Sequence, residues 1–305
     1  MERHTAGGLL PGLVFASLCF IWGSTWLAIK VGLGSLPPFF FAGIRFAIAW
    51  SLLVTYALAR KIPFPRDGNS WRVMAFLGLT QIAIPYALTF WGEQYMTAGL
   101  TALLFATLPF FVAIYAHLLI PGEQMTAWKL VGMLTSFIGV TIIFSSELML
   151  APSSFWGGVA VVAASASAAC ANVVGKKYSE SINSTVNVVV QMGIGAILLT
   201  AAGIALERGA SLNLNQTSIV AVFYLAVVGS AFGFIALYWL FTRMEVTRIS
   251  LFTFITPIVA VLLGWIMLGE RVDPNLASGG SLILAGVVLV NHTPKTNQEP
   301  ALPQR

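Results

Sequence analysis

Long apolar runs alternate with short polar breaks along almost the whole chain. Each run has about the 20 residues that a helix needs to cross a membrane, and none shows the two-residue alternation of a strand. The breaks hold Pro, Gly, Asn and charged residues. The pattern therefore predicts an all-α integral membrane protein with ten transmembrane helices, over residues 9–31, 37–59, 71–92, 97–120, 127–146, 153–175, 185–206, 217–241, 247–268 and 274–291.

The composition agrees with this pattern and excludes several classes of protein. Only 9% of the 305 residues are charged and 58% are hydrophobic, whereas soluble domains carry roughly 25% charged residues. The net charge of +5 is spread over single or paired basic residues, so nucleic-acid binding is not indicated. Cys19 and Cys170 lie in apolar runs, which predicts packing roles and no disulfide framework, metal or cofactor.

The two ends of the predicted helices differ in their basic residues. Three lie on one side, Lys30, Arg208 and Arg271, and twelve lie on the other: Arg3, Arg60, Lys61, Arg66, Arg72, Lys129, Lys176, Lys177, Arg243, Arg248, Lys295 and Arg305. The positive-inside rule places the richer side in the cytoplasm. We therefore expect a multi-pass protein of a cell inner membrane with both termini cytoplasmic. The first run is longer than the apolar region of a signal peptide and is expected to remain as a helix.

The second half of the chain repeats landmarks of the first. Gly, Pro, Trp and Gly-Glu recur at offsets of 147 or 148 residues: Trp91 and Trp239, Met96 and Met244, Pro109 and Pro257, Gly122-Glu123 and Gly269-Glu270, Gly132 and Gly279, Gly139 and Gly286. Two five-helix repeats, 1–150 and 151–293, are predicted, followed by a polar cytoplasmic tail, 294–305. Because five is odd, the second repeat is inverted, as is typical of secondary transporters.

The first half also carries short motifs in a fixed order. They are Trp22-Gly23-Ser24-Thr25-Trp26, Pro37-Pro38, Ile44-Arg45-Phe46, Thr97-Ala98-Gly99-Leu100, and the Gly-Glu pairs before the fifth and tenth helices. With the repeat, they resemble the EamA-type branch of the drug/metabolite transporter superfamily over residues 11–291. The resemblance implies a ten-helix carrier with a central cavity, moving small metabolites, amino acids or drugs, usually outward. The chain departs from the family pattern at Gln191, opposite Arg45, and in the small residues 163–171.

Arg45 is the one basic residue well inside a predicted helix. It lies about 12 Å into that helix, and a central Arg costs on the order of 2.5–3.5 kcal/mol on insertion scales, so it must face protein or water. One interpretation is that Arg45 binds an anionic group of the substrate. The other is a structural tie to backbone carbonyls or to Glu93.

Three other ionisable residues are candidates for pairing or titration. Glu93 is the only carboxylate that could couple protons, and its place at a helix end argues against this role. His117 is expected to form a local hydrogen bond, although a pH switch is the alternative. Lys30 is expected to extend to the membrane surface.

Aromatic and amide residues supply the remaining candidates for substrate contact. They are Trp22, Tyr86, Trp91, Asn172, Gln191 and Trp239. Aromatic faces with a hydrogen-bond donor suit organic substrates; the alternatives are an interfacial aromatic belt and bonds between helices.

Proline and glycine mark the candidate moving and packing positions. Pro109 and Pro257 are expected near the middle of their helices, where proline kinks a helix, and are candidate hinges or simple packing residues. The repeated glycines predict close helix contacts. Each Gly-Glu pair predicts a turn whose carboxylate lies near the N-terminus of the following helix.

These features favour a secondary active or facilitative transporter that exports amino acids or related zwitterionic or anionic metabolites by alternating access. Proton-coupled efflux of cationic drugs is the alternative, disfavoured because Arg45 repels cations. An intramembrane enzyme is a distant alternative because the three histidines are dispersed. The expected partners are the lipid bilayer and a small-molecule substrate. Substrate identity, direction, ion coupling and oligomeric state stay open, with a monomer as the simplest case.

Overall fold

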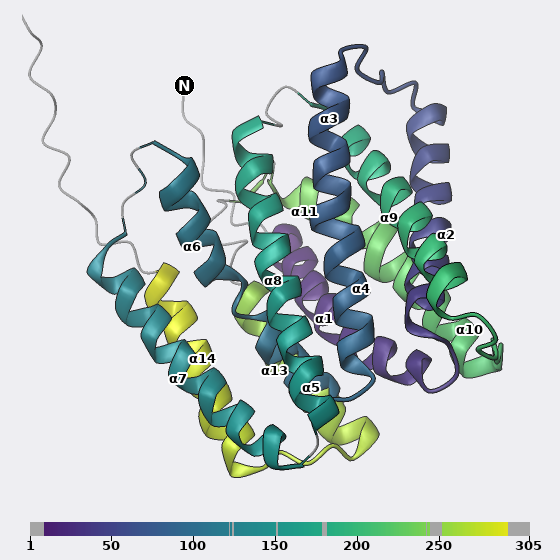
Figure 1. Ribbon diagram of the computed structural model, residues 1–305. Helices are drawn as coiled ribbons and strands as arrows, with labels where there is room; N and C mark the ends of the chain where they lie inside the picture. The colour runs from purple at the N-terminus through teal and green to yellow at the C-terminus, as the bar shows by residue number, and fades with distance from the viewer. Residues whose placement is uncertain are drawn as a thin grey trace, which may run out of the picture.

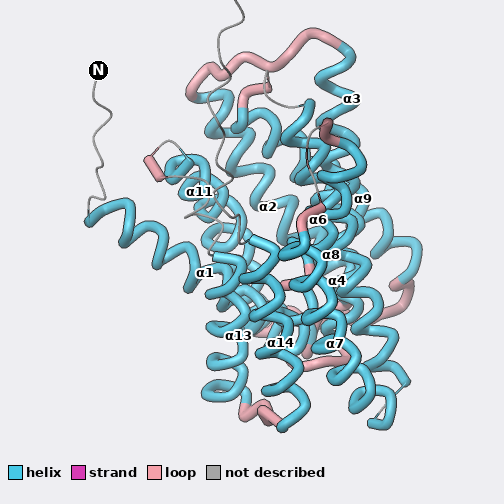
Figure 2. The backbone as a smooth tube through the Cα atoms, turned by 90° about the vertical axis from the view of Figure 1, so that its left-hand side faces the viewer, coloured by secondary structure: helices cyan, strands magenta, loops and turns pink. Residues whose placement is uncertain are grey.

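The computed structural model describes residues 9–121, 123, 125–150, 152–178, 182–241, 243–244 and 252–291. In this part of the chain every regular element is a helix (Figure 2). Nine helical segments are long and apolar enough to cross a membrane, and a further apolar helix, α13, has 17 residues. The predicted fold class is confirmed. The predicted start of the ninth helix, residues 247–251, lies outside the described residues.

The first half provides five helical spans. Its elements are α1 (Leu9–Leu33), α2 (Pro38–Ala59), α3 (Gly68–Leu77), η1 (Gly78–Ala83), α4 (Ile84–Glu93), α5 (Ala98–Phe105), α6 (Leu108–Leu119) and α7 (Ala127–Leu150). The segment η1 is π-helical and joins α3 to α4 in one continuous span. The fourth span is broken: α5 ends at Phe105 and α6 begins at Leu108.

This break changes the expected position of Pro109. The sequence predicted a kink near the middle of one helix, but Pro109 lies in the first turn of α6. Proline lacks the N–H that a helix interior needs and is tolerated in a first turn, where that N–H has no partner. Its repeat counterpart, Pro257, lies inside the uninterrupted helix α13. Both prolines are buried.

The second half follows the same plan. Its elements are α8 (Pro152–Tyr178), α9 (Ser184–Leu206), α10 (Gln216–Phe223), η2 (Tyr224–Phe232), α11 (Gly233–Phe241), α13 (Phe252–Leu268) and α14 (Pro274–Asn291). The π-helical segment η2 joins α10 to α11, as η1 joins α3 to α4. The helices before them start alike: Asp67 Oδ1 accepts from the N–H of Ser70 at 2.7 Å, and Asn215 Oδ1 accepts from that of Ser218 at 2.8 Å.

The contact between α7 and α14 shows that the repeats are inverted. A Cβ atom at Gly132 would lie 2.6 Å from the carbonyl oxygen of Gly286, and one at Gly139 would lie 2.5 Å from that of Gly279. Gly132 and Gly139 are the repeat counterparts of Gly279 and Gly286, so each glycine meets the counterpart of the other. Equivalent helices that cross in this antiparallel and self-complementary way are related by a pseudo-twofold axis, and the glycines allow their close approach.

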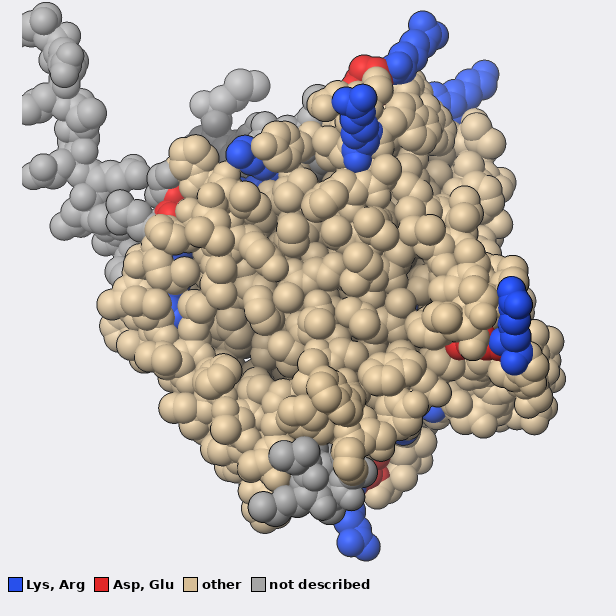
Figure 3. Space-filling model, viewed as in Figure 1, with Lys and Arg blue, Asp and Glu red and all other residues tan. Residues whose placement is uncertain are grey.

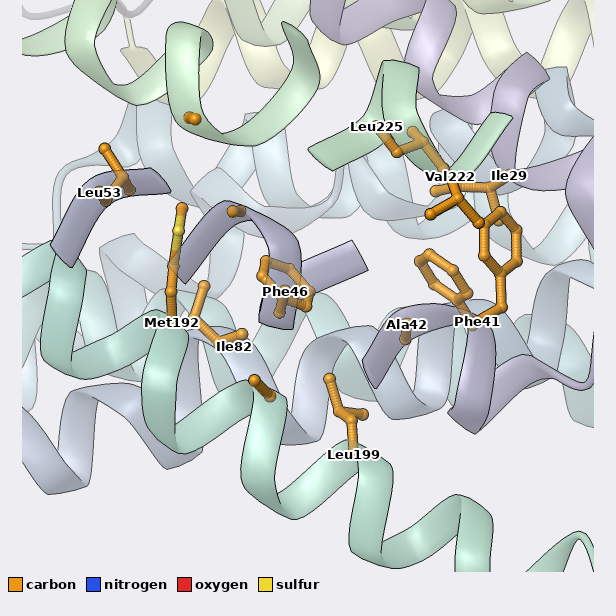
Figure 4. Packing of buried hydrophobic residues seen from close by; sticks show 14 of the residues in the cluster. Ile29, Phe41, Ala42, Phe46, Leu53, Ile82, Met192, Leu199, Val222 and Leu225 are labelled. Atoms are coloured by element: carbon orange, nitrogen blue, oxygen red, sulfur yellow. The ribbon is translucent and has the colours of Figure 1, made fainter. Parts of the chain in front are cut away.

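The largest hydrophobic core lies where α2 of the first half packs on α9 and the η2 span of the second. In Figure 4 the side chain of Phe41 on α2 points toward Val222 of α10 and Ile29 of α1. Phe41 and Phe46 are both fully buried. This core joins the two halves directly, because its residues come from both.

The helices run between two ends, which we name from Figure 1. At the upper end α3 begins and α2 and α8 finish; at the lower end α5 and α10 begin and α1, α4 and α9 finish. In Figure 3 basic side chains project mostly from these ends, and the face between them is nearly free of charge. This apolar band suits contact with lipid hydrocarbon.

Candidate functional site

The π-helical segment η2 bonds to the first half through three polar contacts. Trp22 Nε1 donates to the carbonyl oxygen of Gly229 at 3.1 Å. The hydroxyls of Ser24 and Tyr224 lie 2.6 Å apart, and Arg45 Nε donates to Ser230 Oγ at 3.1 Å. We call these six residues the central polar layer. Isolated π-helical turns occur frequently at functional sites, and here one faces helices α1 and α2 of the other repeat.

The repeat counterpart η1 faces the second half in the same way. Ser167 Oγ of α8 donates to the carbonyl oxygen of Thr80 at 2.9 Å. A Cβ atom at Gly78 would lie 2.9 Å from the side chain of Ile194 on α9. In addition, the buried Oε1 of Gln81 has no hydrogen-bond partner. Each half therefore presents a π-helical segment to the other at the middle of the molecule.

Arg45 is the centre of the polar layer. Only 3% of the residue is exposed, and its guanidinium carbon lies 4.9 Å from the ring centroid of Tyr86 and 6.0 Å from that of Phe90. Its Nη1 is buried without a hydrogen-bond partner. The suggested tie between Arg45 and Glu93 is absent, because neither carboxylate oxygen of Glu93 has a hydrogen-bond partner. Arg45 thus has a buried donor group that no other residue satisfies.

The predicted aromatic residues lie in two places. Trp22 and Tyr86 adjoin the polar layer: Trp22 packs edge-on to Phe252 at 4.9 Å, and Tyr86 to Phe46 at 4.6 Å. Trp91 lies nearer the lower end, where it lines a pocket. The structure therefore brings two of these three residues together with Arg45.

The candidate residues of the second half either are exposed or contact residues other than Arg45. Gln191 is buried on α9 and donates from Nε2 to Asn187 Oδ1 at 2.9 Å. Asn172 on α8 is exposed. The ring centroid of Trp239 on α11 lies 4.2 Å from the guanidinium carbon of Arg243. The polar groups that η2 contributes, Tyr224 and Ser230, were missed by the sequence reasoning.

Two carboxylates of the second half close the lower end against helices of the first. Glu207 accepts from the backbone N–H groups of Phe39 and Phe40 at 2.8 and 2.9 Å. Glu270 accepts in the same way from Ala98 and Gly99 at 2.8 and 3.3 Å. The first N–H groups of a helix lack intrahelical partners and attract negative charge. We call Glu207 and Glu270 the lower-end clamps.

The Glu270 clamp corrects the prediction for the Gly-Glu turns. Gly269 has φ +66°, which favours glycine, and the N–H of Glu270 bonds back to the carbonyl oxygen of Gly264 at 3.1 Å. This turn directs the carboxylate to α5 of the other half, while Asp273 caps the following helix by accepting from Leu276 N at 2.7 Å. The prediction of a following-helix contact is therefore wrong for Glu270.

The matching Gly-Glu pair behaves differently. The carboxylate of Glu123 forms ion pairs with Lys129 and Lys176 at 3.6 and 3.7 Å. His117 forms the local hydrogen bond that was expected, from Nδ1 to the backbone oxygen of Glu123 at 2.9 Å. Glu123 thus lies at the upper end in contact with basic side chains, and one of them, Lys129, is in the first turn of the following helix, α7, as the prediction for this pair required.

A pocket of about 540 Å³ opens at the lower end beside the clamps. We call it the lower vestibule; it is lined by Lys30, Val31, Gln94, Tyr95, Met96, Thr97, Leu268 and Glu270. The Nζ of Lys30 donates to the backbone oxygens of Glu93 and Gln94 at 2.9 and 3.3 Å. Instead of extending freely to the surface, as predicted, its ammonium is held by these carbonyl groups.

Glu93 also departs from its prediction. It ends α4, as expected, yet it is 0% exposed. Its position at a helix end therefore does not give its carboxylate access to water. Within the described residues no three His, Cys, Asp or Glu side chains gather as a metal site would require.

The model of the EamA-like transporter family matches residues 10–145 and again residues 155–292. The chain belongs to the EamA-like transporter family. The double match agrees with the inverted halves, each of which corresponds to one copy of the family's repeated unit.

Several curated relatives of this EamA-like protein are named as transporters. It is 27% identical over 282 residues to the uncharacterized transporter YoaV of Bacillus subtilis, covering 91% of this chain and 95% of YoaV. It is 29% identical over 287 residues to the uncharacterized inner membrane transporter YedA of Escherichia coli K12, covering 92% and 91%. One solved crystal structure has the same fold, with a TM-score of 0.65, 19% identity, and coverage of 92% of this chain and 97% of that one.

Proposed function

We propose that this EamA-like protein is a secondary active or facilitative transporter that exports amino acids or related zwitterionic or anionic metabolites by alternating access. The observation that carries the proposal is the unpartnered Nη1 of Arg45, a buried cation between the two halves. A buried charge needs a partner, and guanidinium groups match carboxylates well. The aromatic rings beside it suit an organic side chain.

The inverted halves support alternating access. Their central contacts come from side chains and π-helical segments, and their lower-end contacts come from the clamps and from the bond between Asn215 Nδ2 and Ser35 Oγ at 2.9 Å. Such contacts can separate while each half keeps its own helices. Rocking of inverted halves around a central site is the general mechanism of such transporters. Pro109 and Pro257 remain the candidate hinges, and Trp22, Tyr86, Trp91, Gln191, Asn172 and Trp239 the candidate substrate contacts.

The twelve basic residues on the side of the N-terminus support an inward-facing upper end, with both termini in the cytoplasm. The name of YedA supports an inner membrane location. In this orientation the lower end faces outward, and the conformation described here is closed on the outer side by the clamps.

Counterflow in proteoliposomes over a panel of labelled amino acids, sugars and lipophilic drug cations tests the substrate class. We expect carboxylate-bearing compounds to be transported. Arg45→Gln should raise their KM about ten- to hundredfold, because a hydrogen bond to a charged group is lost, and Arg208→Gln, at an exposed arginine, serves as the control. Transport of lipophilic cations alone, or an unchanged KM in Arg45→Gln at equal folded amounts, would contradict the proposal.

A further inference from the structure

A carboxyl group without any hydrogen bond lies inside the bundle near the lower vestibule. Glu93 is 0% exposed, and neither Oε1 nor Oε2 has a hydrogen-bond partner. Buried polar groups in proteins are almost always hydrogen-bonded, and an ionised carboxylate without donors is strongly unfavourable in such surroundings. These surroundings therefore accommodate a neutral carboxylic acid better than a carboxylate.

The two basic groups in electrostatic range of Glu93 do not supply those donors. They are Lys30 on α1 and Arg45 on α2. The ammonium of Lys30 is directed to backbone oxygens, and the Nε of Arg45 to Ser230. Neither group lies within ion-pair distance of the carboxylate.

The other neighbours of Glu93 do not favour a negative charge. Glu270, which follows α13, is in electrostatic range and carries the same charge. Along α4, the helix α8 presents Gly157 and Val161 at the level of Gly92, one residue before Glu93. The residues of α8 at this level, 152–161, include no ionisable side chain.

Lys30 connects Glu93 to the lower vestibule. It lines the vestibule and donates to the backbone oxygen of Glu93. The Glu270 clamp forms another wall of the same vestibule. Opening of the lower end would release the Glu270 contact, which joins the two halves, and bring water to the carboxyl group, where its ionised form is well solvated and free to pair with Lys30.

We propose that Glu93 is a proton-binding site, which takes up a proton when the lower end closes and returns it to the water of the lower vestibule when that end opens. The inference rests on the proposed alternating access. Because binding and conformation are linked reciprocally, a lower pH on that side stabilises the closed conformation. The open and the closed conformation bind the proton at different pH values. Between these two values, binding of one proton per closure changes the ratio of closed to open molecules about tenfold for each pH unit.

Infrared titration of the full chain in lipid nanodiscs tests the proton site without a substrate. At neutral pH the wild-type protein should show the carbonyl stretch of a protonated carboxyl group, and Glu93→Gln should remove it. Glu123→Gln is the control, since this carboxylate forms ion pairs with Lys129 and Lys176 at the other end of the molecule, away from the clamps, and the band should persist there. Absence of the band from the wild-type protein, or its persistence in Glu93→Gln, would overturn the proposal.

Spin-label distances test the link to conformation. Labels at Tyr95→Cys and Val272→Cys, both more than 40% exposed, span the Glu270 clamp when Cys19 and Cys170 are replaced by Ala. The fraction of molecules with the short label-to-label distance of the closed conformation should increase as the pH falls. In Glu93→Gln the short distance should predominate at every pH. A pH response that is the same in Glu93→Gln, or no response in the labelled parent protein, would overturn the coupling even if counterflow confirms the transporter.

Discussion

At the scale of single residues, the site consists of buried polar groups with incomplete hydrogen bonding. The buried side-chain atoms without a partner in the described part of the chain belong to three residues, Arg45, Gln81 and Glu93. All three lie on α2 or on the span formed by α3, η1 and α4. Such groups are costly to keep in a folded protein, so each of them is a candidate position for a bound molecule or proton.

Ser230 should act as a positioning residue for Arg45. Because its hydroxyl accepts the Nε–H, Ser230→Ala removes one hydrogen bond to a charged group, worth about 1.5–3 kcal/mol, and lets the guanidinium turn away from η2. We expect KM for a carboxylate substrate to rise about two- to tenfold, with a smaller change in kcat. Counterflow kinetics measure both values. Ser136→Ala, which removes a buried hydroxyl in the α7–α14 contact, should leave KM unchanged; an equal rise there would contradict the positioning role.

At the scale of the elements, the repeat reproduces local structure beyond what the sequence landmarks indicated. The π-helical segments η1 and η2 occupy equivalent positions. Their sequences, Gly78–Ala83 and Tyr224–Phe232, share no motif from which a π-helix could be predicted. The capping residues Asp67 and Asn215 are also equivalent. Residues of different type thus support the same helix geometry in the two halves.

Asp67 should stabilise α3 in a pH-dependent way. The backbone N–H of Ser70 lowers the pKa of the Asp67 carboxyl, which lies just outside the span. A lowered pKa means that the cap stabilises the folded protein above the ordinary pKa of an aspartate and loses this effect as the pH falls through the lowered value. Asp67→Ala should reduce Tm at neutral pH, whereas Asp67→Asn should keep the cap, as Asn215 does. In thermal unfolding, a lower Tm in Asp67→Asn than in Asp67→Ala would contradict this account.

The α7–α14 contact should not tolerate larger residues. A side chain at Gly139 would meet the backbone of Gly279, which cannot move aside cheaply. Gly139→Val should therefore destabilise the protein by about 1–3 kcal/mol, the usual cost of overpacking. Gly12→Val, where a Cβ atom meets nothing within 4 Å, is the matched control. Thermal unfolding in detergent measures the difference, and equal stability of the two variants would show that the helices are not in close contact.

At the scale of the whole molecule, the two halves meet in a central layer and at the lower-end clamps. The ten helices could be predicted because each is marked by the length of its own apolar run. The inversion could be predicted because the repeated glycines are visible when the two halves of the sequence are compared. It missed the clamps, since the partners of Glu207 and Glu270 lie about 170 residues away in the chain and only the fold brings them together. The burial of Glu93 was missed for the same reason.

The Glu270 clamp should control how often the lower end opens. Glu270→Gln weakens the contact between a charge and a helix N-terminus by about 0.3–2 kcal/mol, which corresponds to about two- to thirtyfold more opening. Met96 lies in the vestibule wall and is only 4% exposed. An impermeant maleimide should therefore modify Met96→Cys faster in the Glu270→Gln background, by the same factor as the increase in opening. Gly264→Ala, whose Cβ would collide with the carboxylate of Glu270, should act in the same direction. Unchanged modification rates in both variants would show that the Glu270 clamp does not control opening of the lower end.

Alternating access between the halves is tested most directly by locking the lower end. Ser35→Cys and Asn215→Cys replace two side chains in contact, one from each half, in a background with Cys19 and Cys170 replaced by Ala. After oxidation, verified by mass, we expect counterflow of any amino acid identified by the panel to stop and to return on reduction. Transport at an undiminished rate by the fully oxidised protein would contradict the account.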